Sequence, residues 1–280
     1  MSDVLVSTTW AVEHHTDADK RFIEVDVDTT QYETGHLPGA IAFNWQSQLQ
    51  DAIARDIISK ENFEKIASEA GITPQTIVVL YGDNNNWFAA YAFWLFKYYG
   101  HEDVRLIDGG RKKLVAENRP MVIEVPSYAK TDYKVTKINP DLRADRDYVR
   151  THLDKIGAGF GLVDVRSSAE YVGDIIAPPG MTETAQRPGH IPGAKNIPWA
   201  TAVAEDGTFK SVEELQKIYG GKGISGDKEV VAYCRIGERS SHTWFALKYL
   251  LGIENVRNYD GSWTEWGNLI GAPIAKGAEV

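Results

Sequence analysis

The segment EVVAYCRIGERS, residues 229–240, decides the fold of this chain. It begins with a short Val-rich run typical of a buried strand, and an amphipathic stretch to Gly252 follows it with the pattern of a helix. A turn from the carboxyl end of a strand into a helix gathers unpaired backbone N–H groups and the positive end of the helix dipole. The segment therefore predicts a strand, an anion-binding turn at CRIGER (234–239), and a helix.

The chain contains a second copy of this pattern. The matched segments are IVVLYGD (77–83) with EVVAYCR (229–235), GHLPGA (35–40) with GHIPGA (189–194), and YYGHEDVRLIDGG (98–110) with YLLGIENVRNYDGS (249–262). Between Val78 and Gly110 the two copies stay in register, at an offset of 152 residues. Because the matched blocks keep the same order, the chain is predicted to be an internal repeat.

Each copy alternates short apolar runs with longer amphipathic stretches. That alternation predicts an α/β fold of two tandem domains, each a mainly parallel sheet flanked by helices. Residues 120–141 have no partner in the other copy and carry three prolines. We therefore predict a first domain at residues 1–126, a linker at 127–138 and a second domain at 139–280.

Composition excludes several classes of protein. The chain has 280 residues, 43% of them hydrophobic, which excludes global disorder. Its net charge of -9 argues against a nucleic-acid partner or an anionic membrane surface. The longest apolar run, Trp87–Phe96, is too short to cross a bilayer, and the first residues lack the pattern of a signal peptide. We expect a cytoplasmic protein without a membrane partner.

The sequence gives no sign of a cofactor or a metal. Neither a G-x-G-x-x-G motif nor a P-loop occurs, so no nucleotide cofactor is expected. A single cysteine, Cys234, excludes an intramolecular disulfide and a multi-cysteine metal site. The histidines show no metal-ligand spacing. His36 and His190 recur in both copies, so we expect them to have a structural role.

Cys234 lies where a reactive thiolate would be built. Backbone N–H groups of the turn would stabilise a thiolate, and Gly237 permits the tight turn. Arg235 and Arg239 outnumber Glu238, so we expect the pKa of the thiol to be lowered. The alternative is an inert core cysteine, since free cysteine is among the most buried residue types. Two nearby arginines favour the reactive interpretation, because guanidinium groups are costly to bury beside an inert thiol.

The first copy acts as an internal control for this chemistry. At the offset of 152, it has Gly82, Asp83 and Trp87 where the second copy has Cys234, Arg235 and Arg239. The first copy thus has the turn but neither the nucleophile nor its cations. We predict that activity belongs to the second domain alone.

At these residues the chain resembles a tandem-domain rhodanese, a thiosulfate sulfurtransferase. The amino-terminal signature of that family is similar to Tyr32–Ala40, and the carboxyl-terminal signature is similar to Val256–Trp266. The resemblance implies an inactive first domain and a second domain in which Cys234 becomes a persulfide. It implies thiosulfate as sulfur donor, cyanide as laboratory acceptor, and a thiol or protein thiol as physiological acceptor.

The active loop separates members of this family by donor. Thiosulfate-using members resemble CR-x-G, whereas members that use 3-mercaptopyruvate resemble CG-[ST]-G, and Arg235 favours thiosulfate. The substrate-binding residues that the resemblance implies are Arg235, Ile236, Gly237, Glu238, Arg239 and Arg166. Ile236 replaces a lysine of the vertebrate-type loop CRKGVT, and Glu170 replaces a second family arginine.

Three alternatives remain beside this interpretation. One is transfer from 3-mercaptopyruvate. Another is a cysteine-dependent phosphatase, although its C-x5-R-[ST] loop is one residue longer than the loop between Cys234 and Arg239. The last is a non-enzymatic module that binds a protein partner, which would fit a buried and unreactive Cys234.

Overall fold

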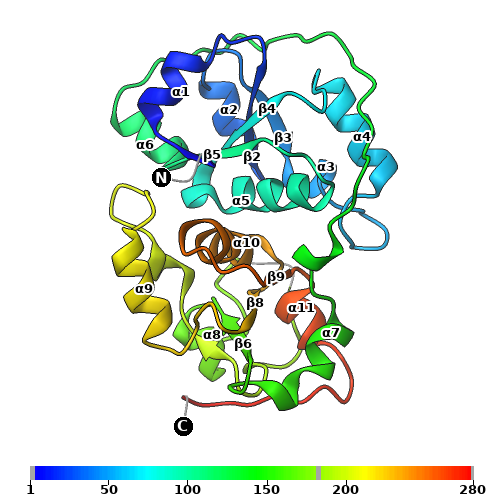
Figure 1. Ribbon diagram of the computed structural model, residues 1–280, viewed down its shortest axis with the longest axis vertical. Helices are drawn as coiled ribbons and strands as arrows, with labels where there is room; N and C mark the ends of the chain where they lie inside the picture. The colour runs from blue at the N-terminus through cyan, green and yellow to red at the C-terminus, as the bar shows by residue number, and fades with distance from the viewer. Residues whose placement is uncertain (1–3, 181–183, 279–280) are drawn as a thin grey trace. The chain divides into compact units, whose positions relative to one another are not determined.

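The computed structural model describes residues 4–180 and 184–278, and these form two compact units. The first unit runs to Pro140 and includes Glu205–Thr208. The second unit runs from Asp141 and takes the remaining residues. Each unit is a parallel sheet flanked by helices, which confirms the predicted fold class (Figure 1).

The first unit holds a parallel sheet with the strand order β1-β5-β4-β2-β3. Its strands are β1 (Leu5–Val6), β2 (Lys20–Asp26), β3 (Ile41–Asn44), β4 (Ile77–Tyr81) and β5 (Val104–Ile107). Its helices are α1 (Thr8–His14), α2 (Thr30–Thr34), α3 (Trp45–Gln48), α4 (Lys60–Glu69), α5 (Asp83–Tyr98) and α6 (Gly110–Ala116). The apolar helix α5 packs against β2, β4 and β5, and therefore buries most of its length.

The second unit holds a parallel sheet with the order β7-β6-β8-β9. Its strands are β6 (Phe160–Asp164), β7 (Lys195–Asn196), β8 (Glu229–Tyr233) and β9 (Val256–Tyr259). Its helices are α7 (Arg146–Thr151), α8 (Ser168–Val172), α9 (Val212–Gly220), α10 (Glu238–Phe245) and α11 (Ser262–Trp266). Its short helical segments are η1 (Pro140–Leu142), η2 (Leu153–Lys155), η3 (Trp199–Ala202) and η4 (Ala246–Leu250). The predicted strand and helix around Cys234 are thus β8 and α10.

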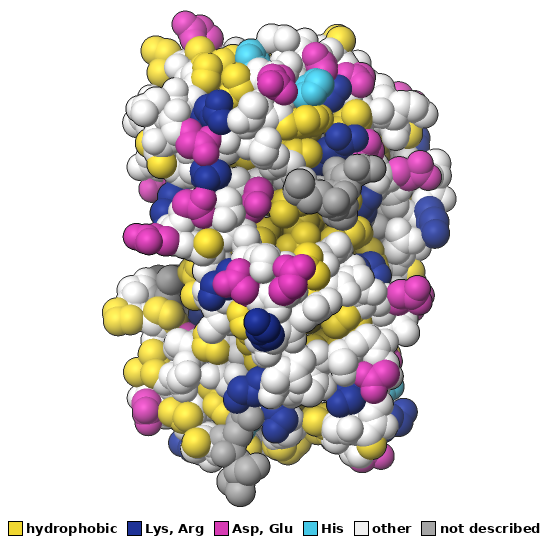
Figure 2. All heavy atoms as spheres, turned by 60° about the vertical axis from the view of Figure 1, so that its left-hand side comes forward, with side chains coloured by type: hydrophobic (Ala, Val, Ile, Leu, Met, Phe, Trp, Pro, Cys, Tyr) yellow, Lys and Arg dark blue, Asp and Glu magenta, His cyan; other side chains and the backbone are white. Residues whose placement is uncertain are grey.

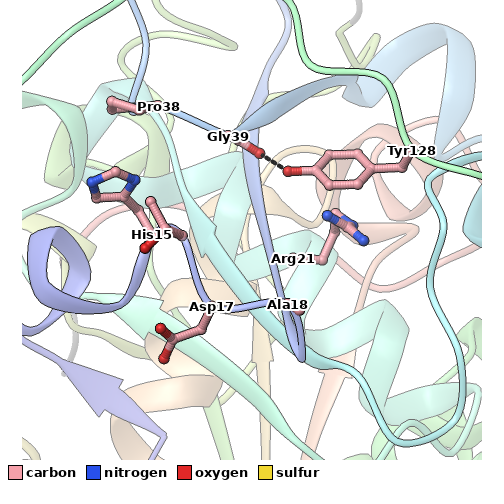
Figure 3. A pocket seen from close by; sticks show the side chains of 8 residues that line it. His15, Asp17, Ala18, Arg21, Pro38, Gly39 and Tyr128 are labelled. Carbon is pink, nitrogen blue, oxygen red and sulfur yellow. Dashed lines mark hydrogen bonds between the residues drawn. The ribbon is translucent and has the colours of Figure 1, made fainter.

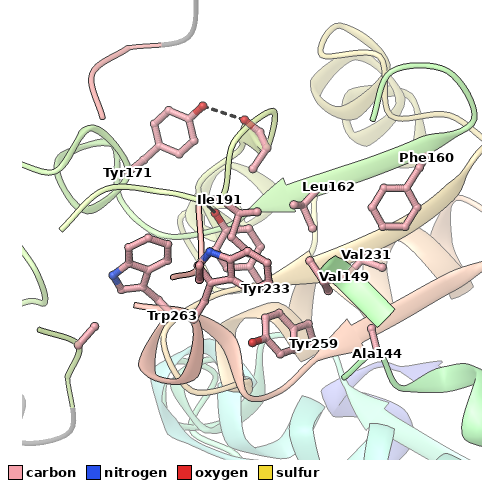
Figure 4. Packing of buried hydrophobic residues seen from close by; sticks show 14 residues of the cluster. Ala144, Val149, Phe160, Leu162, Tyr171, Ile191, Val231, Tyr233, Tyr259 and Trp263 are labelled. Carbon is pink, nitrogen blue, oxygen red and sulfur yellow. Dashed lines mark hydrogen bonds between the residues drawn. The ribbon is translucent and has the colours of Figure 1, made fainter. Parts of the chain in front are cut away.

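The core of the second unit lies directly beneath the Cys234 turn. Figure 4 shows aromatic side chains from β8, β9 and α11 packed together, among them Tyr233, Tyr259 and Trp263. These three side chains are fully buried. Large rigid side chains in a close-packed core fix the backbone that carries them. The packed aromatic core therefore fixes the position of the end of β8, which Cys234 directly follows.

The two units repeat each other down to single hydrogen bonds. In the first unit the Tyr32 ring stacks on His36 with centroids 3.6 Å apart, and its hydroxyl donates to the carbonyl of Ala40 at 2.8 Å. The second unit has the same stack between Tyr171 and His190, at 3.6 Å, and the same bond to the carbonyl of Ala194, at 2.7 Å. Both imidazole Nδ1 atoms bond the carbonyl oxygen of that tyrosine. The structural role predicted for the two histidines is confirmed.

The segment interpreted as a linker, residues 127–138, belongs to the first unit. Tyr133 and Val135 are buried there. The Tyr128 hydroxyl donates to the Gly39 carbonyl at 2.6 Å, and its ring lies 3.1 Å from the guanidinium carbon of Arg21 (Figure 3). Tyr128 is the residue of this segment that lines a surface pocket of about 410 Å³, and the segment packs as part of the domain.

Charged side chains are mixed on the surface. On the face drawn in Figure 2, basic and acidic side chains both occur in the upper and the lower half of the view. Within residues 4–180 and 184–278, every helix is too short or too polar to cross a bilayer.

The shared tyrosine motif predicts equal effects in the two units. Tyr32→Phe and Tyr171→Phe each remove one buried hydrogen bond, and each should lower the free energy of unfolding by about 1 kcal/mol. Urea unfolding followed by circular dichroism measures both changes. Tyr98→Phe is the control, because the Tyr98 hydroxyl has no hydrogen bond within the described residues. A large loss in one variant and none in the other would contradict the equivalence of the two motifs.

Candidate active site

The turn between β8 and α10 brings the predicted loop residues together. It carries Cys234, Arg235, Ile236, Gly237, Glu238 and Arg239, which follow the carboxyl end of β8 and lead into the first turn of α10. The Cys234 sulfur accepts the Gly237 backbone N–H at 3.1 Å and lies 3.6 Å from the Ser240 hydroxyl. The cysteine side chain is fully buried. The predicted anion-binding turn thus encloses the sulfur atom.

Ser262 is a site residue that the sequence analysis missed. Its hydroxyl accepts the backbone N–H of Cys234 at 3.0 Å. The φ of Ser262 is 53°, and Gly110, which faces it in the first copy, has a φ of 55°. A non-glycine residue in the left-handed region is uncommon, and Gly110 shows that the turn has this backbone conformation in both units. The sequence signal for this residue is that the first copy reads DGG at residues 108–110, whereas the second copy reads DGS at residues 260–262.

The surroundings of Cys234 raise the pKa of its thiol. Burial is the first cause, and the nearby Glu238 carboxylate is the second; Arg239 acts in the opposite direction. The Glu238 carboxyl oxygen Oε2 lies 3.4 Å from the sulfur. The expectation that cations outweigh Glu238 and lower this pKa was therefore wrong for the resting protein. Its error was to count charges without their distances and burial.

Arg239 is held by a carboxylate that sequence analysis treated only as a departure from the family. Its two terminal nitrogens bond Glu170, from Nη1 to Oε2 at 3.0 Å and from Nη2 to Oε1 at 3.1 Å. Glu170 is fully buried and also closes a capping box with Ser167 at the start of α8. Burial opposes the charge of Glu170, but Arg239 holds the pKa of this carboxyl below its usual value. The Glu170 replacement thus supplies a partner for Arg239.

Arg166 lies in the interior of the second unit. It pairs with Asp164 and donates to the carbonyl of Gly189 at 2.7 Å. Its guanidinium carbon lies 4.4 Å from the centre of the Trp263 ring, and its side chain has no solvent exposure. The structure places Arg166 near Glu170, whose pKa its charge also lowers. A direct contact between Arg166 and a donor molecule stays a prediction.

The matching edge of the first unit is acidic. In the register of the two sheets, Asp26 takes the place of Arg166, and its carboxylate accepts the backbone N–H of Asp83 at 2.7 Å. A Cβ added at Gly82, the position that faces Cys234, would lie 2.4 Å from the Val25 carbonyl oxygen. This turn therefore has no room for a cysteine side chain, and it carries Asp26 and Asp83 where the second unit carries Arg166 and Arg235.

Metal ligands do not gather in the described ranges. No group of three or more His, Cys, Asp or Glu side chains that could hold a metal ion occurs in residues 4–180 or 184–278.

Comparison with known proteins gives one family for both units. The model of the rhodanese-like domain matches residues 7–117 and again 145–269. A "Putative thiosulfate sulfurtransferase" of Haloferax volcanii is 57% identical, over 98% of this chain and 97% of its own. The sulfur carrier protein TtuD of Thermus thermophilus is 58% identical, over 99% of this chain and 98% of its own.

Solved structures agree with these relatives. The crystal structure of SseA from Escherichia coli, described as a 3-mercaptopyruvate sulfotransferase with the "Rhodanese" fold, superposes with a TM-score of 0.80 and 25% identity. That match covers 93% of this chain and 98% of the other. The similarity thus extends over both units.

Asp26 should make the stability of the first unit depend on pH. Burial raises the pKa of Asp26 to about 8, so the folded protein holds a proton there that the unfolded chain releases near its ordinary pKa of 3.8. The free energy of unfolding should therefore fall as pH rises from about 4 to about 8, by up to about 1.4 kcal/mol for each pH unit. Asp26→Asn cannot ionise and should be the more stable protein, by a margin that is larger at pH 8 than at pH 5.

Urea unfolding at the two pH values measures this margin. Asp132→Asn is the matched control, since the Asp132 side chain is 86% exposed. A margin for Asp26→Asn that is the same at pH 5 and pH 8 would show that Asp26 is ionised in the folded protein.

Proposed function

The chain belongs to the rhodanese family, and we propose that this sulfurtransferase takes sulfane sulfur from thiosulfate onto Cys234 and passes it to a thiol or to cyanide. The observation that carries the proposal is the Cys234 sulfur at the base of the turn, with the Gly237 N–H 3.1 Å away. A backbone donor at that distance stabilises negative charge on sulfur. Both half-reactions use the same atom, so the cycle is ping-pong.

Charge supports thiosulfate as the donor. Thiosulfate is a dianion, so its sulfonate needs a cation while the sulfane sulfur approaches Cys234. Arg235 and Arg239 lie in the active loop, and the CR-x-G pattern of that loop accords with the name of the Haloferax relative. Arg235 directly follows Cys234 in the turn, so we assign the sulfonate contact first to Arg235, and Arg239, which also bonds Glu170, is the second candidate. 3-Mercaptopyruvate, named for the Escherichia structure, is the second candidate donor.

A protein acceptor is supported by the name of one relative. The Thermus relative is called a sulfur carrier protein, which fits a chain that holds sulfur as a persulfide and hands it on. In this role Cys234 carries the sulfur between two partners. We propose a thiol or protein thiol as the natural acceptor and cyanide as its laboratory substitute.

The geometry gives little support to a phosphatase. In that class an arginine at the end of the loop clamps the phosphoryl oxygens with its two terminal nitrogens. Here both terminal nitrogens of Arg239 bond Glu170. The loop from Cys234 to Arg239 is also one residue shorter than the phosphatase loop.

Cys234→Ser tests the nucleophile. Serine keeps the size of the side chain but does not form a persulfide, so transfer from thiosulfate to cyanide should fall to background while the far-UV circular dichroism stays unchanged. Thiocyanate formation and the intact mass after thiosulfate treatment measure the two half-reactions. The wild type should gain the mass of one sulfur, and cyanide should remove it. Substantial turnover by the serine variant would refute the assignment of Cys234.

Arg235→Ala tests the donor contact. Loss of one charge-assisted contact should lower kcat/KM for thiosulfate about tenfold, while discharge of a pre-formed persulfide to cyanide stays nearly unchanged. The exposed Arg150 of α7 gives the matched control Arg150→Ala. Wild type should have a higher kcat/KM with thiosulfate than with 3-mercaptopyruvate. Equal losses in both half-reactions of Arg235→Ala would remove Arg235 from the donor site.

A further inference from the structure

We infer that Glu238 is the proton partner of Cys234: it accepts the thiol proton as sulfur is loaded and returns it as sulfur is discharged. This inference rests on the proposed sulfurtransferase function. It assigns a catalytic role to a residue that the family resemblance placed only among the substrate-binding residues.

The contact between the two side chains is direct. The thiol of Cys234 donates to Oε2 of Glu238 at 3.4 Å, within the usual range for a sulfur donor. Glu238 is 2% exposed, so bulk water does not reach its carboxyl easily. Its other oxygen, Oε1, lies 3.6 Å from Nε of Arg239. One carboxylate thus faces the reacting sulfur on one side and a cation on the other.

The first unit shows that this turn does not need a carboxyl for its own support. Asn86 faces Glu238 at the repeat offset, and its side-chain oxygen accepts the backbone N–H of Gly82 at 3.0 Å. In the second unit the equivalent backbone N–H, that of Cys234, is bound by Ser262. The side chain at position 238 is thereby released from the backbone and turned toward the sulfur.

The charges around Glu238 explain why a proton acceptor is needed. The groups that face it are Cys234 in the turn and Arg239 on α10, with Glu170 of α8 behind that arginine. Burial and the Glu238 charge keep the resting thiol protonated, so the nucleophilic form has to be generated when the donor arrives. Transfer of the proton to Glu238 makes the thiolate without adding a negative charge to the site.

The loading step balances with this transfer. The Cys234 thiol gives its proton to the Glu238 carboxylate, and the sulfur attacks the sulfane sulfur of thiosulfate. A new S–S bond forms on Cys234 as the S–S bond of thiosulfate breaks, and its electron pair leaves with sulfite. The products are an ionised persulfide, a neutral Glu238 carboxyl and the sulfite dianion, with the same total charge as the reactants.

Discharge reverses the proton transfer. An acceptor such as cyanide attacks the outer sulfur of the persulfide, and the electron pair of the broken S–S bond returns to the Cys234 sulfur. The Glu238 carboxyl then gives its proton back to that thiolate. Thiocyanate leaves, and the pair is again a thiol beside a carboxylate.

The pH dependence of single-turnover sulfur loading tests the inference. Loading of the full chain is followed by quench-flow and intact mass between pH 5.5 and 8.5, with thiosulfate and in parallel with 3-mercaptopyruvate. Wild type should load at a nearly constant rate, because Glu238 takes the proton. Glu238→Gln must lose the proton to water, so its rate should fall about tenfold per pH unit below the thiol pKa. Glu229→Gln, at the other end of β8, should keep the wild-type profile.

Alkylation of Cys234 by iodoacetamide separates this inference from the proposed function. Removal of the neighbouring negative charge should lower the thiol pKa, so Glu238→Gln should be alkylated faster than wild type at pH 7. If Glu238→Gln is alkylated faster but neither donor loads sulfur onto wild type, the proposed function is refuted. The proton transfer that rests on it is then refuted as well. If loading by Glu238→Gln matches wild type at every pH, or alkylation does not change, Glu238 is not the proton partner.

A second variant, Glu238→Asp, tests the inference even if Glu238→Gln does not fold. Glu238→Asp keeps the carboxylate but shortens its reach, so it should load more slowly than wild type and retain the flat pH profile. A sloping profile for this variant would also overturn the inference.

Discussion

The tight turn from β8 into α10 is the constraint on which the rest of this site depends. A parallel strand that passes directly into a helix directs backbone N–H groups at one point, and the Cys234 sulfur lies at that point. The aromatic core beneath fixes the strand end, while α11 contributes Ser262 from the side. Neighbouring charges then set the protonation of the sulfur. The first unit has the same scaffold, and its different side chains leave it with an acidic edge.

Much of this arrangement could be predicted from the sequence. The repeat offset placed strand, turn and helix correctly in both copies, because an apolar run before a glycine-containing turn has few other structures. The same offset marked Cys234 as the residue by which the copies differ. Local patterns of this kind specify backbone structure well, since they depend on neighbours in the chain.

The electrostatics of the site could not be predicted in the same way. Glu170 and Arg239 lie far apart in the sequence, and only the fold brings their side chains together. Arg166 was expected among the substrate-binding residues, and its pairing with Asp164 in the core was not foreseen. The thiol pKa depends on burial and on the 3.4 Å contact with Glu238, which charge counting does not include. The Glu170–Arg239 ion pair and the burial of Arg166 and of the thiol depend on contacts that only the tertiary fold makes, and local sequence patterns do not contain this information.

The buried resting thiol has a consequence for the durability of the protein. Oxidation of cysteine to sulfenic and higher acids proceeds through the thiolate and requires access for the oxidant. Cys234 is buried and the pKa of its thiol is raised, so only a small fraction of the resting sulfur is the thiolate that oxidants attack. Within a chain that has one cysteine, no second thiol exists to rescue a sulfenic acid as an intramolecular disulfide. The raised thiol pKa is therefore the feature of this site that slows oxidation of its single sulfur.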